Sequence, residues 1–194
     1  PMAVRILALA GSIISTCFNK RLLHLSIEAA REEGAEVTFV DLLETRFPHF
    51  SFDDEEKNGL PDVAVELKTH LKTHHGLLVA APEFNGSFCT TLKAAIDWCH
   101  RPDPEKRTEL GDFQGKVGAI LSASKWDHSG IRGLGHLRTV LASVGVTLIP
   151  DTVSMPHARE AFTPEWETKD PYYGEEARKT ARALVQACRK FQGS

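Results

Sequence analysis

The chain of 194 residues lacks the features that mark several classes of protein. It carries 23 Lys and Arg against 26 Asp and Glu, and the resulting net charge of −3 provides no basic field for a nucleic-acid backbone. Its apolar runs, such as Ile6 to Ala10 and Leu77 to Pro82, are far too short to cross a bilayer. No long apolar segment with a cleavage site opens the chain, so we expect no signal peptide. These absences predict a cytoplasmic protein that binds neither nucleic acid nor membranes.

Signatures of hydrolytic, metal and dinucleotide sites are absent as well. The sequence contains no G-x-S-x-G, G-x-G-x-x-G or Walker A motif. Its nine histidines are scattered and its four cysteines form no C-x-x-C pair, so we predict no metal site. In a chain without a signal peptide, we expect Cys17, Cys89, Cys99 and Cys188 to be reduced thiols. The last three are expected to serve as small, partly buried apolar residues.

Patterns typical of strands and of helices alternate along the whole chain, of which 42% is hydrophobic. The predicted strands are Ala3 to Ala10, Ala35 to Asp41, Gly76 to Ala80, Gly115 to Ser122 and Val146 to Ile149. The predicted helices are Asn19 to Glu33, Leu60 to Lys72, Cys89 to His100, Ile131 to Val144 and Glu175 to Phe191, and the predicted irregular stretches are Leu42 to Gly59 and Pro150 to Gly174. This alternation predicts a five-stranded parallel sheet with helices on both faces, in one domain that spans residues 1–194.

In open sheets of this kind, ligands bind beyond the carboxyl ends of the strands, so the loops after the first, third and fourth strands are the candidate site. The first loop, Gly11 to Asn19, opens a helix whose free backbone N–H groups can bind an anion. Ser12, Ser15 and Thr16 add hydroxyl donors to it, and Asn19 adds an amide. An ordinary helix N-cap with solvated serines explains this loop as well.

The second loop, Ala81 to Ser87, follows the apolar third strand. Pro82 and Gly86 predict an unusual turn whose backbone amides face a flat heterocycle, with Phe84 and Asn85 beside it. A purely structural turn is the alternative explanation.

The third loop, Ser122 to Gly130, follows the fourth strand, and a simple polar connection before a helix is the alternative here. Gly130, Gly133 and Gly135 read G-x-x-G-x-G, which is not a nucleotide fingerprint. We expect these glycines to permit close packing where the next helix begins.

Together, the three loops resemble the NADPH-dependent FMN reductase family of flavodoxin-like proteins, which includes flavin, quinone, azo-dye and chromate reductases. The first loop is similar to the family's G-S-x-R-x-x-S-x-N motif, and the second to P-E-Y-N-G-S followed by L-K-x-A-I-D-W. The third is similar to its S-A-S loop followed by G-x-R and H-L-R, and the resemblance extends to Val153 through Ala158. It implies a flavodoxin-like three-layer α/β sandwich with strand order 2-1-3-4-5.

The resemblance also implies which residues bind the cofactor. Where the family binds the FMN phosphate stand Ser12, Cys17 and Asn19, with Phe18 beside them. Where it lines the isoalloxazine and ribityl region stand Pro82, Glu83, Phe84 and Asn85. Near the pyrimidine end of the flavin stand Ser122 and Ser124. Asp97 and Trp98 match the family too, and we expect them to pack their helix rather than contact the ligand.

Two residues of the first loop depart from the family pattern. The family's arginine is Ile14 here, and its second serine is Cys17. Losing a charged hydrogen bond costs roughly 1.5–3 kcal/mol, which is about one to two decades in dissociation constant. Either FMN binds weakly, or another group supplies the missing charge.

The resemblance implies an oxidoreductase that passes hydride from NADPH or NADH to FMN. The electrons then go to a small-molecule acceptor: a flavin, a quinone, an azo compound or a metal oxyanion. Because the cofactor carries this chemistry, we predict no catalytic side chain and interpret Glu83 as orienting backbone. No second nucleotide motif is found, which favours NAD(P)H and acceptor alternating at one open site. The alternative, favoured by Ile14 and Cys17, is a non-catalytic flavin-binding protein, electron carrier or sensor with a weakened phosphate site.

Members of the family are usually homodimers or homotetramers, so the resemblance implies a homo-oligomer. Phe47, Phe50 and Phe52 serve either such an interface or the domain's own core, and the same two possibilities hold for Tyr172 and Tyr173. The residues that are candidates for contact with the 2′-phosphate of NADPH are Lys125, Arg132 and Arg101. The sequence selects neither NADH nor NADPH, and it does not identify the acceptor.

Overall fold

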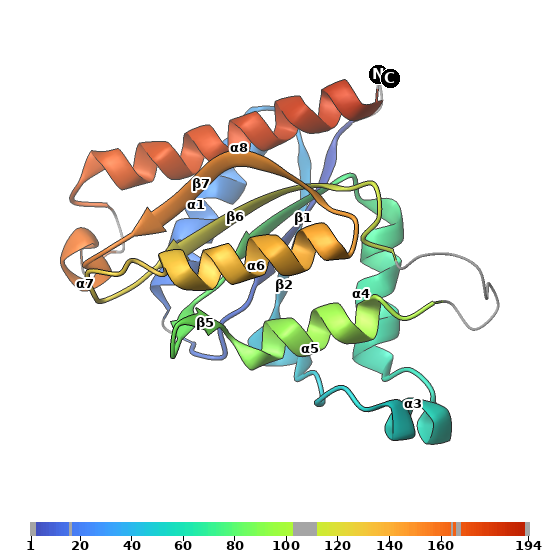
Figure 1. The fold of residues 1–194 in the computed structure, drawn as a ribbon. Helices are drawn as coiled ribbons and strands as arrows, with labels where there is room; N and C mark the ends of the chain where they lie inside the picture. Colours follow the sequence, from blue (N-terminus) through green and yellow to red (C-terminus); the bar gives the residue numbers. More distant parts are fainter. Residues whose placement is uncertain (1–2, 16, 103–111, 164, 166–167, 193–194) are drawn as a thin grey trace.

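The computed structural model describes residues 3–15, 17–102, 112–163, 165 and 168–192. Its central feature is a sheet of five parallel strands in the order β2-β1-β3-β6-β7 (Figure 1). In chain order these strands are β1 (Arg5–Ala10), β2 (Glu36–Asp41), β3 (Gly76–Ala80), β6 (Val117–Ala123) and β7 (Thr147–Met155). The predicted order 2-1-3-4-5 is confirmed, because β6 and β7 are the fourth and fifth strands of this sheet.

Helices cover both faces of the sheet, as the sequence predicts. One face carries α1 (Phe18–Glu32) and α8 (Pro171–Gln192), and the other carries α4 (Asp62–Thr73), α5 (Thr90–Cys99) and α6 (Ile131–Ser143). In Figure 1, α5 and α6 lie in front of the sheet and α1 lies behind it. Side chains alternate between the faces along each strand, so Ile6 and Ala8 join the α1–α8 core while Leu7 and Leu9 join the other. The three-layer α/β architecture is therefore confirmed.

The predicted irregular stretch from Leu42 to Gly59 contains two short helices, α2 (Leu42–Thr45) and α3 (Phe52–Asn58). The Asp41 carboxylate accepts a hydrogen bond from the Leu43 N–H (3.0 Å) and caps α2. The Ser51 hydroxyl accepts one from the Asp54 N–H (3.3 Å) and caps α3 in the same way. Helices of one or two turns show little apolar periodicity, so only these cap residues could have predicted them.

The fifth strand is longer than the sequence predicts. β7 continues through Pro150 to Met155, although a proline has no N–H for a ladder bond. Two features allow a proline in this strand: β7 is an edge strand, and its register against β6 shifts between Gly118 and Ile120.

Two helices begin inside the second predicted irregular stretch. The short α7 (Ala158–Ala161) follows β7, and α8 begins at Pro171, earlier than the predicted start at Glu175. A proline is favoured at the first helical position, because its missing N–H has no partner there in any case.

The aromatic residues between α2 and α5 divide between core and surface. Phe50 packs edge-on against Trp98 with ring centroids 4.9 Å apart, and Phe47 also packs against the core. Phe52 is 65% exposed. Trp98 is buried and its indole N–H donates to the Pro48 carbonyl (3.0 Å), so its predicted packing role is confirmed. Asp97 pairs on the same helix with Lys93 (2.7 Å).

The four cysteines are free and buried, as predicted for reduced thiols. Burial raises the pKa of Cys99 to about 12 and that of Cys188 to about 11, so both thiols stay protonated at neutral pH. No helix in the described part of the chain combines the length and the apolar character that a membrane span requires.

Substitution of Gly130, just before α6, can test how tightly the third loop packs. It has a φ of 84°, and a Cβ there would lie 2.0 Å from the Ser122 Oγ. Gly130→Ala should therefore lower the free energy of unfolding by about 2–4 kcal/mol, from the clash and the left-handed backbone together. Urea denaturation measures this difference.

Gly135, inside α6, offers a matched control. A Cβ at Gly135 meets nothing within 4 Å, so Gly135→Ala should stabilise the protein by about 1 kcal/mol through helix propensity. Equal effects of the two substitutions would contradict the packing described here.

Candidate functional site

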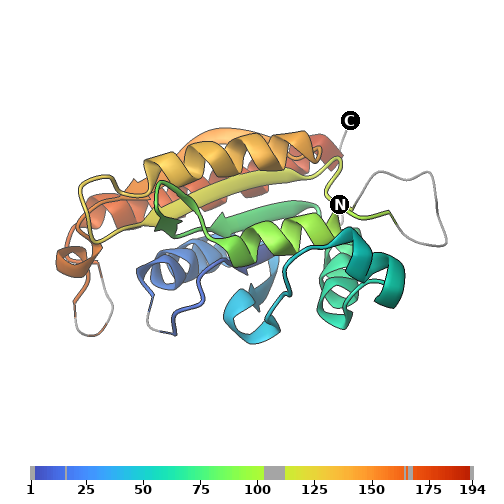
Figure 2. The same cartoon turned by 60° about the horizontal axis from the view of Figure 1, so that its bottom comes forward.

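The five strands of the main sheet point the same way, so the loops after β1, β3 and β6 gather at one end of it (Figures 1 and 2). There they enclose a pocket of about 530 Å³. The predicted site residues that line it are Ser12, Cys17, Phe18, Asn19, Pro82, Glu83, Phe84, Asn85 and Ser124. Its other lining residues are Ile14, Gly86, Ala123, Lys125, Trp126, His128 and Arg132.

Ser122 is the one predicted residue that does not line the pocket. Its side chain is fully buried against Gly130, and its hydroxyl has no hydrogen-bond partner among the described residues. Of the three cations predicted as candidates for the nicotinamide nucleotide, Arg101 also lies elsewhere, because it pairs with Glu55 (2.7 Å) beside Phe50.

The pocket has the start of α1 as one wall. The first bond of this helix runs from the Arg21 N–H to the Cys17 carbonyl (3.2 Å), so the N–H groups of Asn19 and Lys20 have no acceptor within the helix. The first turn contains no acidic residue, and the Cys17 thiol makes no capping hydrogen bond. This wall therefore offers backbone donors and no negative charge, which suits an anion.

Two polar residues of the first loop are already engaged. The Ser12 hydroxyl accepts from the Ile14 N–H (3.2 Å), which leaves its own proton for a ligand. The Asn19 amide donates to the Ala123 carbonyl and accepts from the Ala123 N–H, each at 2.9 Å, which leaves one N–H. Asn19 thus joins the start of α1 to the end of β6. Ser15 is exposed, and Thr16 lies outside the described residues.

The second loop is a β-hairpin made of β4 (Glu83–Phe84) and β5 (Ser87–Phe88). Its two turn residues, Asn85 and Gly86, have φ values of 51° and 83°, which is a type I′ turn. This hairpin was not predicted from the sequence, although an Asn-Gly pair is a strong signal for it. The hairpin presents Phe84, 44% exposed, at the pocket.

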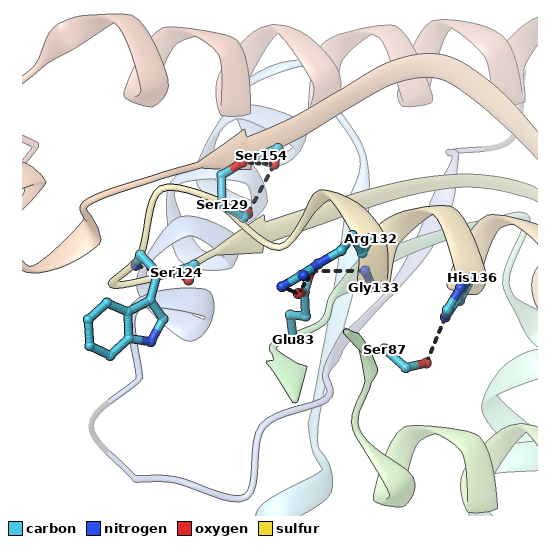
Figure 3. A network of polar contacts seen from close by, with 9 residues as sticks. Glu83, Ser87, Ser124, Ser129, Arg132, Gly133, His136 and Ser154 are labelled. Carbon is cyan, nitrogen blue, oxygen red and sulfur yellow. Dashed lines mark hydrogen bonds and ion pairs between the residues drawn. The ribbon is translucent and has the colours of Figure 1, made fainter. Parts of the chain in front are cut away.

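Glu83 connects this hairpin to α6. Its carboxylate accepts hydrogen bonds from the Arg132 Nε (2.8 Å) and from the Gly133 backbone N–H (3.1 Å), as Figure 3 shows. Gly133 is in the first turn of α6, so Glu83 caps a helix from a different loop, as a backbone-orienting residue does. Burial alone would raise the pKa of Glu83, but the Gly133 N–H and the Arg132 guanidinium outweigh it and lower this pKa.

The third loop is fastened to the end of β7. The Ser124 N–H donates to the Met155 carbonyl (2.9 Å), and the Ser124 carbonyl accepts from the Ala158 N–H (2.8 Å). The Ser129 and Ser154 hydroxyls lie 2.6 Å apart and point toward each other in Figure 3. On this fixed loop, Trp126 is 73% exposed at the pocket.

Comparison with known proteins identifies the family. Residues 4–160 match the sequence profile described as NADPH-dependent FMN reductase. The chain belongs to this family. It is 29% identical over 191 residues to an NAD(P)H-dependent FMN reductase of Pseudomonas aeruginosa, covering 98% of both chains. It is 32% identical over 148 residues to a 2-hydroxy-1,4-benzoquinone reductase of a Burkholderia species, covering 76% of this chain and 75% of that one.

A solved structure agrees on the fold. The flavoenzyme NAD(P)H:(acceptor) oxidoreductase FerB from Paracoccus denitrificans superposes with a TM-score of 0.81 at 21% identity, over 97% of this chain and 98% of that one. The comparisons confirm the predicted family, the flavodoxin-like fold, the NAD(P)H-dependent oxidoreductase class and FMN as cofactor. The alternative of a non-catalytic flavin-binding protein is not favoured, because the named relatives are reductases.

The Glu83 contacts lead to a prediction about stability and pH. Glu83→Gln should lower the free energy of unfolding by about 1 kcal/mol at neutral pH, because an ion pair that is partly exposed on the arginine side is lost. Since the folded pKa of Glu83 is lowered, its contribution is complete above the ordinary value of 4.5 and disappears as the pH falls through the folded value.

Urea unfolding of both proteins, at neutral pH and in acid, measures this effect. The difference in free energy of unfolding between the wild type and Glu83→Gln should become smaller in acid. Glu56→Gln, which removes an exposed carboxylate on α3, should not differ from the wild type at either pH. If the stability difference between the wild type and Glu83→Gln did not depend on pH, the ionised Glu83 carboxylate would be ruled out as its cause.

Proposed function

We propose that the pocket holds FMN with its phosphate at the start of α1 and its ring between the β4–β5 hairpin and the third loop, and that the protein uses it to reduce quinones with NADPH or NADH. The observation that carries the proposal is the convergence of nine predicted cofactor residues on one pocket, with a helix N-terminus as one of its walls. We further propose that residues 1–194 act as one cytoplasmic FMN-binding domain.

The residues of the pocket fit this cofactor. Its volume lies within the range of about 300–1,000 Å³ that is usual for ligand pockets. Among the described lining residues the only carboxylate is Glu83, which Arg132 neutralises, so no free negative charge opposes the phosphate. Pro82, Phe84 and Trp126 supply apolar surface for a flat ring system.

When bound, FMN supplies the acceptance of a hydride and the delivery of electrons to the acceptor. The protein's own residues position the reactants. Glu83 holds the hairpin against α6, and Asn19 holds α1 against the third loop, so the walls of the pocket keep their spacing. No side chain has to take up a proton in the hydride step, so the residues of the lining are needed for positioning.

Quinones are favoured as acceptors by the apolar mouth of the pocket. Phe84 and Trp126 expose 44% and 73% of their surface there, and aromatic rings stack well on flat conjugated molecules. Several relatives bear quinone reductase names, including an NADPH:quinone oxidoreductase of Arabidopsis thaliana that is 31% identical over 164 residues.

Steady-state kinetics with FMN, NADPH and a naphthoquinone test the proposed function. We expect NADPH oxidation that depends on FMN, with parallel lines in double-reciprocal plots, because both substrates use one pocket in turn. Intersecting lines would show that both substrates bind together, and no turnover by the FMN-loaded protein would refute the proposed activity.

Trp126→Ala tests the apolar mouth. The kcat/KM for a naphthoquinone should fall by about three- to tenfold, which corresponds to one lost aromatic stacking contact. The kcat/KM for ferricyanide, a hydrophilic acceptor without a ring, should not change. Phe191→Ala is the matched control, since Phe191 is 57% exposed on α8 and does not line the pocket. Equal losses for both acceptors would assign Trp126 a different role.

We also propose that the protein is a homodimer or homotetramer. The exposed rings of Phe52 and Tyr172, at 65% and 61%, are candidates for subunit contacts. Sedimentation velocity measures the assembly directly, and a monomer at all concentrations would refute this part of the proposal.

A further inference from the structure

We infer that Lys125, on the third loop, supplies the positive charge to the FMN phosphate that the first loop of this chain lacks. The inference rests on the proposed function, because it needs the phosphate to lie at the start of α1. It assigns a cofactor-binding role to a residue outside the predicted cofactor set, for which the sequence indicated only a possible contact with NADPH.

The proposed phosphate site has too little positive charge in the first loop alone. A phosphate monoester carries about −1.5 to −2 charges at neutral pH, and a helix N-terminus compensates only about half a charge. Ile14 stands where the family has arginine, and this apolar side chain lines the pocket at 48% exposure. The Cys17 thiol is a weak donor. The first loop alone therefore leaves most of the phosphate charge unmatched.

The cations near the proposed phosphate site differ in whether they already form ion pairs. Lys20 is in the first turn of α1, but its Nζ lies 2.6 Å from Asp41 Oδ2, with both side chains largely buried. Arg132 lines the pocket, but it pairs with Glu83. Lys125 lines the pocket, is exposed, and forms no ion pair with any residue in the described part of the chain. Lys125 is therefore the lysine or arginine of the described lining whose charge is uncommitted.

His128 is the other basic side chain of the described lining. It lies on the same loop, three residues after Lys125. The Lys125→Gln variant separates the two residues, because it leaves His128 in place.

Lys125 is held near the start of α1. Asn19, in the first turn of α1, forms two hydrogen bonds with the backbone of Ala123. Lys125 is two residues further on, so its Cα is within about 7.6 Å of the Ala123 Cα. Between them Ser124 is tied to Met155 and Ala158, so the base of the lysine is fixed. From this base, the flexible stem of a lysine can extend toward an anion at this helix end.

Equilibrium titration of the apoprotein with FMN and with riboflavin, followed by flavin fluorescence, tests this inference without any turnover. Riboflavin carries the same ring and ribityl chain but no phosphate. Lys125→Gln should weaken FMN binding by about tenfold, the lower end expected for a charged hydrogen bond at an exposed site, and should leave riboflavin affinity unchanged. Added salt should weaken FMN binding to the wild type more than to the variant.

Two further variants complete the design. Ile14→Arg in the Lys125→Gln background should restore FMN affinity, because it returns a cation to the first loop. Lys57→Gln, an exposed lysine on α3 outside the pocket, should bind both flavins like the wild type.

Each other outcome has a definite meaning. Equal FMN affinity of wild type and Lys125→Gln, or an equal loss for FMN and riboflavin, would overturn the role of Lys125 while leaving the proposed function intact. Loss of NADPH affinity alone would assign the charge to the nicotinamide nucleotide and also overturn it. If the wild type binds neither flavin, the proposed function itself fails.

Discussion

The pair of hydrogen bonds between the Asn19 amide and the Ala123 backbone sets the geometry of the candidate site. These residues are 104 positions apart, and the bonds are buried, where an unpaired amide or carbonyl would cost about 1–3 kcal/mol. The end of β6 therefore stays at the start of α1. The third loop begins at this contact, and the Glu83 contacts to α6 hold the second loop against the helix that follows the third loop.

The parallel sheet is what makes such contacts possible. The carboxyl ends of β1, β3 and β6 are adjacent because the strands pair in the order β2-β1-β3-β6-β7. Three loops that are distant in sequence then share one pocket, and each contributes a different kind of surface: backbone donors at α1, an apolar hairpin, and a loop with exposed Lys125 and Trp126. This division suits a cofactor with an anionic end and a flat conjugated end.

The sequence predicts the sheet, its order and most of the pocket lining, because apolar periodicity and the family motifs are local properties of the chain. It does not predict the partner of Glu83 or that of Asn19, because neither Arg132 nor Ala123 is near its partner in sequence and no periodic pattern connects them. The sequence also does not show that Ser122 lies outside the pocket, for a related reason. Its position in a motif is visible in the sequence, but the approach of Gly130 over its side chain depends on how α6 begins. The extension of β7 past Pro150 likewise depends on its place at the edge of the sheet.

The contacts that hold the third loop have one property in common. Asn19 binds the backbone of Ala123, and the backbone of Ser124 binds those of Met155 and Ala158. None of these bonds depends on which side chains stand at positions 125, 126 and 128, which project at the pocket. Substitutions at these three positions can therefore change the charge, the aromatic character and the acid–base properties of the pocket while the loop keeps its path. A protein with such a loop can change its preference among electron acceptors through single substitutions. Because these substitutions do not destabilise the fold, no compensating second mutation is needed.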